Sequence, residues 1–600
     1  MTVQALRPRP KRDAVLCFVL ALWFAIFTAP TTQASPGTGG DPFLKEPIWV
    51  YNNWTAYDEL ADVVRLTEDL AMRELDEIVR LRGLGVRIDY YVMDAFWYAR
   101  SGGYRRWRTR DWPVGPDRWL EACRQHGIVP GLWFGTNTLT KIHAVPAWQS
   151  SLNERGEAMS FYAGGFLADF MEVLQLWYDR GIRLFKFDFA DFGAAAAGTE
   201  RVHTHHEIRL RNTRAFREEL RAFRERNPGV VLVAFNGFGG DMESTAAPFP
   251  FEDIVDLQWL DVFDSLYAGD PRPADVPHMN FWRSVDVYSD HMVRRFEQSG
   301  VPLPRIDSTA FMIGHTGSNY FRGINAWQGS LLLTVARGGW VNTVHGNLEF
   351  LDDDRARWFA RLQSLYAPLQ QAGTTRSFGG LPGDAEPYGY VSAEPGGALY
   401  TVVNPSQRVA AIRLPRASRD QPLNSGGRVL FRDAGFEPRL QRNSIQLGPG
   451  QLALVGFGRY ANPVHDLGVQ EDVQIPRKIE PLPVLFTGDD SGRIAEAAID
   501  PPPTGDLRIV MQQRYTDGSI IRSKSHGDMA NFLTITADQD GKSVRVVTRY
   551  DKVIWSGLSW AVGEIRRSDI DSTKPIRVRL SSAERDFPVV LDGQAFRVTY

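Results

Sequence analysis

The chain has 600 residues, enough for roughly three or four domains, which excludes a lone binding module or a small disulfide-stapled fold. It carries 68 Lys and Arg against 71 Asp and Glu, so its net charge of −3 offers no basic excess for binding nucleic acid or an anionic membrane. We therefore expect no nucleic acid and no membrane among the partners of the mature chain.

The N-terminal segment has the pattern of an export signal. An apolar run from Ala14 to Phe27 is too short to span a bilayer comfortably, and small residues follow it near Ala34. We predict a signal peptide over residues 1–34 and a flexible leader over residues 35–46, with an uncleaved membrane anchor as the alternative. The run is preceded by the basic residues Arg7, Arg9, Lys11 and Arg12.

The two cysteines support the same compartment. Cys17 lies inside the apolar run, so the mature chain retains only Cys123 and cannot form an intramolecular disulfide. An exported chain without disulfides fits the bacterial periplasm or exterior better than a eukaryotic secretory route. One cysteine also excludes a cysteine-based zinc site, and no nucleotide loop or His-Glu-x-x-His spacing is present, so we expect no metal and no cofactor.

Short apolar runs alternate with amphipathic stretches over residues 47–375, the pattern of β/α units around a buried parallel sheet. Eight such units favour an α/β fold with a catalytic (β/α)8 TIM barrel. Helices are predicted at 67–81, 168–179 and 206–226. The predicted strands are 48–52, 86–93, 128–134, 182–187, 230–235, 254–260, 306–312 and 340–344.

After the barrel, the sequence consists of short segments of alternating apolar and polar residues separated by Gly, Pro and Asn. We predict an antiparallel β domain over residues 376–460 and a Pro-rich, weakly structured linker over residues 461–483. Residues 484–600 are again strand-like and are predicted to form an accessory β-sandwich-like domain.

Residues that can carry chemistry stand at the predicted strand ends, which form the open mouth of a barrel. Asp94 follows the second strand, and Asp188 follows the fourth, two residues after Lys186. A cation beside a partly buried carboxylate keeps it ionised and nucleophilic. A purely structural ion pair between Lys186 and Asp188 is the alternative.

Three segments resemble the α-galactosidase (melibiase) superfamily, glycoside hydrolase clan D, families 27 and 36. They are Asp94-Ala95-Phe96-Trp97, Gly131-Leu132-Trp133-Phe134 and Lys186-Phe187-Asp188, and the resemblance covers residues 47–458. It implies that Asp188 is the nucleophile. It further implies that Trp54 and Trp133 form apolar walls of the sugar subsite, that Asp94 accepts hydrogen bonds from hydroxyl groups, and that Lys186 holds an oxygen beside Asp188.

A retaining glycosidase needs a second carboxyl group about 5 to 5.5 Å from the nucleophile. The segment from Trp282 to Asp286 resembles a clan segment, and this resemblance implies that Asp286 is the acid/base and Arg283 a substrate contact. Asp261, which follows Gln258-Trp259 and resembles the corresponding family 36 segment, is the alternative acid/base.

These expectations together predict a secreted, retaining α-glycosidase of α-galactosidase type that cleaves oligo- or polysaccharides by double displacement through two Asp residues. Ala95 stands where the clan usually has a second Asp, which weakens the case for galactose. The same chemistry on an α-glucan or a β-L-arabinopyranoside is therefore one alternative. A catalytically silent carbohydrate-binding protein is another.

Overall fold

The computed structural model describes twelve segments of the chain, all of them within the compact unit Pro42–Tyr600. The expected signal peptide, residues 1–34, and most of the leader lie outside the described residues. Within the described part, no helix is both long enough and apolar enough to cross a membrane. The described segments are 43–54, 65–95, 97–199, 201–238, 255–270, 273–307, 311–314, 324–417, 426–518, 533–548, 559–585 and 588–600.

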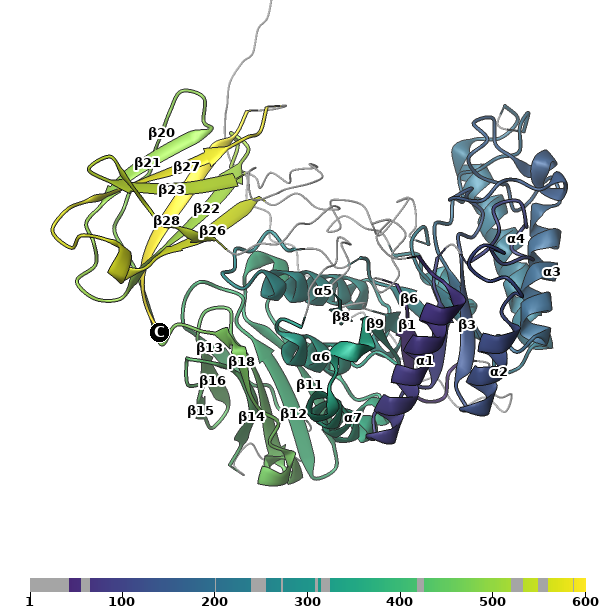
Figure 1. Cartoon of the computed structure of the whole chain (residues 1–600), viewed down its shortest axis with the longest axis horizontal. Coiled ribbons are helices and arrows are strands. Elements are labelled where there is room, and N and C mark those ends of the chain that lie inside the picture. The colour runs from purple at the N-terminus through teal and green to yellow at the C-terminus, as the bar shows by residue number, and fades with distance from the viewer. Residues whose placement is uncertain are drawn as a thin grey trace, which may run out of the picture. The chain divides into compact units, whose positions relative to one another are not determined.

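A parallel sheet of nine strands confirms the predicted (β/α)8 architecture (Figure 1). Its seventh barrel strand comes in two pieces, β7 and β8, which follow one another along β9. The backbone N–H of Trp340 donates to the Pro304 carbonyl (3.0 Å) and that of His345 to the Phe311 carbonyl (3.2 Å), and β9 also pairs with β1. The strands are β1 (Ile48–Asn52), β2 (Tyr90–Met93), β3 (Val129–Phe134), β4 (Leu184–Phe187), β5 (Val231–Ala234), β6 (Ser265–Tyr267), β7 (Ile306–Asp307), β8 (Met312–Ile313) and β9 (Val341–Gly346).

The helices α1, α4, α5 and α7 begin at side-chain caps. Thr67 accepts a hydrogen bond from the Leu70 backbone N–H (3.3 Å), and Thr204 forms a capping box with Glu207. Each cap satisfies backbone donors that the first helical turn leaves unpaired. The helices are α1 (Glu68–Gly83), α2 (Asp117–Gln125), α3 (Phe166–Asp179), α4 (His205–Arg226), α5 (Phe281–Gln298), α6 (Trp327–Ala336) and α7 (Asp353–Ala372).

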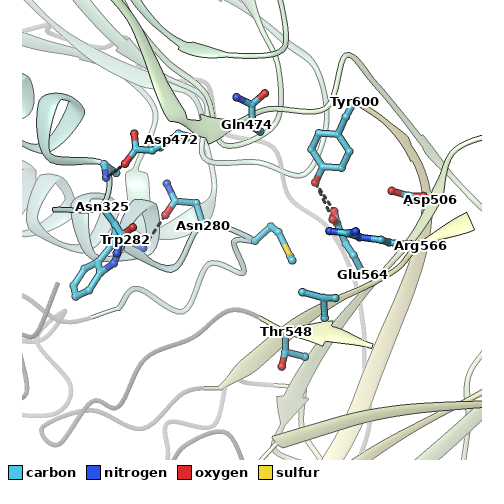
Figure 2. Close-up of a pocket in the computed structure, with 14 residues that line it drawn as sticks. Asn280, Trp282, Asn325, Asp472, Gln474, Asp506, Thr548, Glu564, Arg566 and Tyr600 are labelled. Atoms are coloured by element: carbon cyan, nitrogen blue, oxygen red, sulfur yellow. Dashed lines mark hydrogen bonds between the residues drawn. The ribbon is translucent and has the colours of Figure 1, made fainter. Parts of the chain in front are cut away.

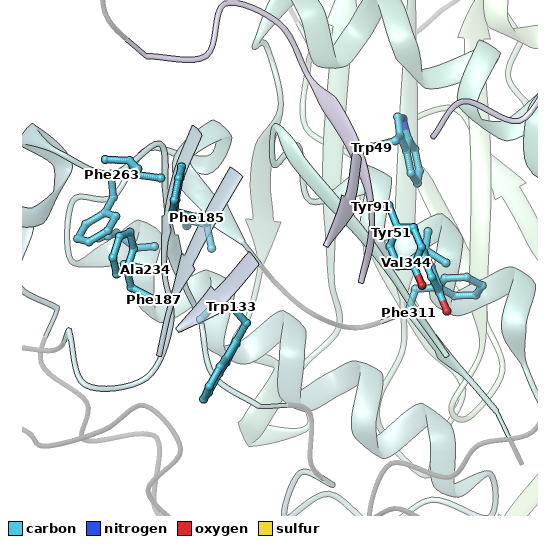
Figure 3. Close-up of a cluster of buried hydrophobic side chains, with 14 of the residues drawn as sticks. Trp49, Tyr51, Tyr91, Trp133, Phe185, Phe187, Ala234, Phe263, Phe311 and Val344 are labelled. Carbon is cyan, nitrogen blue, oxygen red and sulfur yellow. The ribbon is translucent and has the colours of Figure 1, made fainter. Parts of the chain in front are cut away.

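Side chains alternate along each barrel strand between the helix layer and the barrel interior. Figure 3 shows part of the helix-facing core, with Trp49 and Tyr51 in one group of side chains and Phe185 and Phe187 in another. Burying such a side chain contributes about 1.5–3 kcal/mol. The alternate positions form a separate interior cluster, so residues with the parity of Lys186 point into the barrel. Its members are Ile48, Val50, Val92, Leu184, Val231, Val233, Phe235, Tyr267 and Val341.

The sixth strand does not lie where the sequence predicts it. In the described part of 254–260, which begins at residue 255, the chain forms a short 3-10 helix, η3 (Leu257–Asp261), and β6 follows at Ser265–Tyr267. Trp259 gives η3 a buried anchor, because its ring packs 4.8 Å from that of Phe192, whereas Leu257 is exposed. The apolar run thus reflects one buried face of a helical turn.

Two sheets follow the barrel, ordered β10-β11-β12-β17-β14-β18 and β13-β16-β15, and their strands are antiparallel apart from the pair β14 and β18. The helices α6 and α7 contact β11. β18 pairs with β14 in parallel. The stretch 461–483 therefore contains an ordered strand, whereas the sequence predicts a weakly structured linker there. The strands are β10 (Arg376–Gly379), β11 (Tyr388–Glu394), β12 (Gly397–Val403), β13 (Ala410–Arg413), β14 (Arg428–Ala434), β15 (Arg439–Gln441), β16 (Ser444–Leu447), β17 (Leu452–Gly458) and β18 (Gly468–Gln474).

The last part of the chain forms two five-stranded sheets that share one apolar core, as expected for a β-sandwich. Ile509 and Met511 come from one sheet, and Ile535 and Val578 from the other. The sheet orders are β19-β28-β22-β26-β25 and β20-β21-β27-β23-β24. The strands are β19 (Lys478–Pro481), β20 (Thr487–Gly488), β21 (Ile494–Ile499), β22 (Asp506–Arg514), β23 (Leu533–Gln539), β24 (Lys542–Val544), β25 (Val547–Thr548), β26 (Trp560–Ile565), β27 (Ile576–Ser582) and β28 (Val590–Thr599).

Candidate active site

Lys186 is the centre of a polar group at the carboxyl ends of the barrel strands. Its Nζ lies 2.8 Å from Oδ2 of Asp94, and both side chains are buried. The same Nζ lies 5.2 Å from the ring centroid of Trp54 and 4.0 Å from that of Phe235. The structure therefore brings the ends of β1, β2, β4 and β5 together around one cation.

Asp188, which directly follows β4, is held by three hydrogen-bond donors. The indole Nε1 of Trp133 donates to its Oδ2 (3.0 Å). The backbone N–H groups of Phe189 and Asn236 donate to its Oδ1 (2.9 and 3.2 Å). Trp54, Asp94, Trp133, Lys186 and Asp188, all predicted from the sequence, thus lie in one site.

The surroundings of Asp188 shift its acidity. Burial raises its pKa to about 6, against the lowering effects of the Lys186 charge and the Trp133 hydrogen bond, while the charges of Asp270 and Asp94 raise it further. Desolvation therefore outweighs the favourable contacts. At neutral pH the group is ionised but poorly solvated, which suits a nucleophile.

Backbone turns on both sides of Asp188 fix its donors. Phe189 has a φ of 52°, a left-handed conformation that costs free energy for a residue with a side chain. Gly237 has a φ of 98°, and a Cβ there would lie 2.1 Å from the Ala190 carbonyl oxygen. Only glycine fits this turn, which presents the N–H of Asn236 to Asp188.

Asp286 and Arg283 do not join this site. They lie one turn apart in α5, where Arg283 Nη1 is 3.2 Å from Asp286 Oδ2 and Nη2 is 2.9 Å from Oδ2 of Asp433 in β14. Ser330 in α6 donates a hydrogen bond to Asp286 (2.5 Å). All four side chains are buried, so this is an ion-pair network that joins α5, α6 and the β domain. These contacts give no support to Asp286 as acid/base or to Arg283 as substrate contact, and both assignments remain predictions from the resemblance.

Asp261, the alternative acid/base, also lies elsewhere. It ends η3 and pairs with Arg217 and Arg221 of α4. Its side chain is 52% exposed. This carboxylate belongs to a surface ion pair on the helix layer.

Asp270, which the sequence pattern places in a rigid turn over the barrel mouth and not in the site, is a buried carboxylate just beyond β6. It accepts a hydrogen bond from the Tyr267 hydroxyl (2.9 Å), and its charge raises the pKa of Asp188. The misplaced sixth strand explains the omission, because Asp270 is a strand-end residue only once β6 is located at Ser265–Tyr267. Asp307 in β7 and His345 in β9 were also missed.

A cavity of about 810 Å³ lies apart from this group of residues (Figure 2). Asn280 and Trp282, at the start of α5, lie on one side, and Glu564 and Tyr600 of the sandwich lie on the other. None of the residues around Lys186 lines it. In the part of the chain that the structure describes, no group of three or more His, Cys, Asp or Glu side chains has the geometry to hold a metal ion.

Comparisons with known proteins find similarity in fold to sugar-processing enzymes. No protein-family model and no curated protein matches the chain. The galactosidase domain of the α-galactosidase–sucrose kinase AgaSK is 14% identical (TM-score 0.48), and the match covers 69% of this chain and 54% of that one. The GH36 α-galactosidase AgaA from Geobacillus stearothermophilus is 13% identical (TM-score 0.47; 68% and 55% covered).

A further solved structure, a putative α-galactosidase/melibiase from Bacteroides fragilis, is 13% identical, with a TM-score of 0.43 and 70% and 80% of the chains covered. Trehalulose synthase MutB is 11% identical with a TM-score of 0.42. The matched region spans about half the length of AgaSK and AgaA. At these identities the likeness describes the arrangement of helices and strands and carries no argument about activity. In that arrangement the chain is similar to the α-galactosidase-like enzymes.

Proposed function

We propose that this chain is a retaining glycoside hydrolase that cleaves α-linked glycosides in oligo- or polysaccharides, with Asp188 as nucleophile and Asp270 as acid/base. The proposal depends above all on the position and the environment of the Asp188 carboxylate. Asp188 is a buried carboxylate at a barrel strand end, fixed by three donors beside Lys186, with a pKa raised to about 6. Asp270 supports the proposal as a described strand-end carboxylate whose charge acts on Asp188; Asp94 acts on Asp188 as well, but it is paired with Lys186.

Each residue has a defined part in the double displacement. Asp188 attacks the anomeric carbon while Asp270 gives its proton to the leaving glycosidic oxygen, so that the C–O bond breaks and a glycosyl ester forms. Asp270 then removes a proton from water, the water oxygen attacks the same carbon, and Asp188 leaves. Two inversions return the α-anomer, and Lys186 with Asp94 holds sugar hydroxyl groups throughout.

Export to the periplasm or exterior of a bacterium is part of the proposal, and it rests on the pattern of residues 1–34 and on Cys123 being the one cysteine left after cleavage. Ala95 leaves the sugar open among galactose, an α-glucan residue and β-L-arabinopyranose. These are alternatives within one reaction class.

The first test is Asp188→Asn, assayed with a panel of aryl α-glycosides. An amide cannot form the glycosyl ester, so kcat should fall at least about 100-fold. Proton NMR of the first-formed sugar should show the α-anomer. Asp261→Asn, a surface control, should keep wild-type activity. An initial β-anomer, or full activity in Asp188→Asn, would remove Asp188 from the nucleophile's role.

The same assay separates Asp270 from the other candidates. Asp270→Ala should retain the first step on substrates with good leaving groups, which need little protonation, and azide should restore turnover because it attacks without a general base. Azide should give no such rescue in Asp261→Ala. Rescue at Asp261, with none at Asp270, would overturn the assignment.

A further inference from the structure

Asp307 and His345 occupy inward-facing positions on the last strands of the barrel. In β7, Ile306 packs in the helix-facing core, and in β9 Val344 does the same, so their neighbours Asp307 and His345 point the other way. The charge of Lys186 acts on both side chains. They therefore face the same interior as Lys186.

Asp307 is a buried carboxyl group with no hydrogen-bond partner in the part of the chain that the structure describes. Its exposed fraction is 1%, and neither carboxyl oxygen has a hydrogen-bond partner among the described residues. Burial raises its pKa to about 7, although Lys186 lowers it. A folded protein rarely leaves a buried polar group unsatisfied, so these two oxygens require an explanation, and a functional role at the site is one.

His345, which packs against Trp54, is also a buried polar side chain with no hydrogen-bond partner among the described residues. The two rings meet edge to face with their centroids 5.6 Å apart. Burial and the Lys186 charge lower the pKa of the imidazole well below its usual value, so the ring is neutral, with one donor and one acceptor nitrogen. The Asn52 backbone lies close enough to raise this pKa slightly, but neither ring nitrogen makes a hydrogen bond of normal geometry with a described residue.

Hydroxyl groups are the ligand chemistry that fits these groups. A hydroxyl can donate to a carboxyl oxygen and can both donate to and accept from a neutral imidazole. A sugar carboxylate does not fit the charges of the described residues. Asp94, Asp188 and Asp307 all interact with Lys186, and Asp270 adds a further negative charge beside Asp188.

We propose that Asp307 and His345 bind hydroxyl groups of a neutral pyranose ring seated beside Trp54 and Lys186, and so determine which sugar the site accepts. The second hydroxyl-binding carboxyl group, absent from β2 where Ala95 stands, then comes from β7. This inference rests on the proposed function for the location of the sugar, but binding can be tested without turnover.

The experiment measures binding of D-galactose, D-glucose, L-arabinose and D-glucuronate to the full chain by calorimetry. At least one neutral sugar should bind, and glucuronate should not. Asp307→Leu, which removes the acceptor at similar volume, should weaken that binding about tenfold or more, and Asp307→Asn, which keeps one acceptor oxygen, should weaken it less. His345→Ala should weaken it as well, whereas Asp261→Asn should not.

The outcomes separate this inference from the proposed catalysis. Asp307→Leu should fold, because it replaces an unpaired buried carboxyl group with an apolar one, and circular dichroism checks this. Unchanged sugar affinity and KM in a folded Asp307→Leu protein, or no binding of any neutral sugar by the wild type, would overturn the inference. Sugar binding that depends on Asp307 in a protein that hydrolyses no glycoside would uphold it and reject the proposed reaction instead.

Discussion

Three buried aspartates in this chain differ in what their neighbours leave them free to do. Asp188 accepts three hydrogen bonds beside Lys186 and still has a raised pKa. Asp286 forms an ion pair with Arg283 and accepts a hydrogen bond from the Ser330 hydroxyl. Asp307 has no hydrogen-bond partner among the described residues. Burial removes the hydration of each carboxylate. The three residues differ in how far hydrogen bonds and opposite charges of the protein compensate for that loss.

The acidity of Asp188 predicts the acid limb of the pH profile. Its pKa is raised to about 6, so the ionised nucleophile is lost as the pH falls through 6, and kcat/KM should fall with it. Trp133→Phe removes a donor that lowers this pKa, and should move the limb to higher pH by up to about one unit. The measurement is kcat/KM from pH 4 to 9 for both proteins. An acid limb near pH 4, unmoved by Trp133→Phe, would contradict the assigned titration.

Local spacing was enough to predict part of this site from the sequence. Lys186 lies in β4 and Asp188 directly follows it, two residues later, so the alternation of side chains along an extended strand predicts that both point the same way. Asp307 carries no such signal, because β7 is only two residues long and its pairing with β6 joins distant parts of the sequence. Long-range pairing of this kind is absent from a single sequence. His345 directly follows the predicted strand 340–344, so the strand-end rule that singled out Asp94 and Asp188 could have found it.

At the level of elements, the position of the sixth strand explains why Asp261 was a candidate for the site and Asp270 was not. This strand has three residues, one of them Ser265, and so lacks the apolar run that predicts a buried strand. The stronger run at 254–260 belongs instead to η3 in its described part. Because the sixth strand was predicted at 254–260, Asp261 was expected at a strand end and Asp270 was not. The barrel as a whole was predicted correctly from the repetition of its units.

The network between α5, α6 and β14 predicts a loss of stability without a catalytic phenotype. Asp286→Ala leaves Arg283 buried with half of its counter-charge, and should lower the free energy of unfolding by about 3–5 kcal/mol. Asp261→Ala breaks only an exposed pair and should cost about 1 kcal/mol or less. Urea unfolding measures both. Folded Asp286→Ala should keep kcat within a few fold, and azide-rescued turnover there would return Asp286 to the active site.

At the scale of the whole described unit, one apolar cluster joins the barrel, the β domain and the sandwich. Trp282 comes from α5, Phe436 from the β domain, and Trp560 and Phe596 from the sandwich. Polar contacts accompany it, since the Trp560 indole donates to the Ala274 carbonyl (2.8 Å) and the Ser559 hydroxyl to Asp275 (2.8 Å). The sandwich also has its own core, so it can retain structure when this junction weakens.

We therefore expect the contacts of Trp560 to couple the unfolding of the sandwich to that of the barrel. Trp560→Ala removes a fully buried ring from the junction and should cost about 3–5 kcal/mol. Because the separate core of the sandwich is untouched, we expect calorimetry to show one transition for the wild type and two for this variant. Trp560→Phe keeps much of the apolar contact and loses the hydrogen bond to Ala274, so it should lower the melting temperature less and keep one transition. A single, equally shifted transition in both variants would mean that the coupling passes through other contacts, with Trp560 contributing only its own burial.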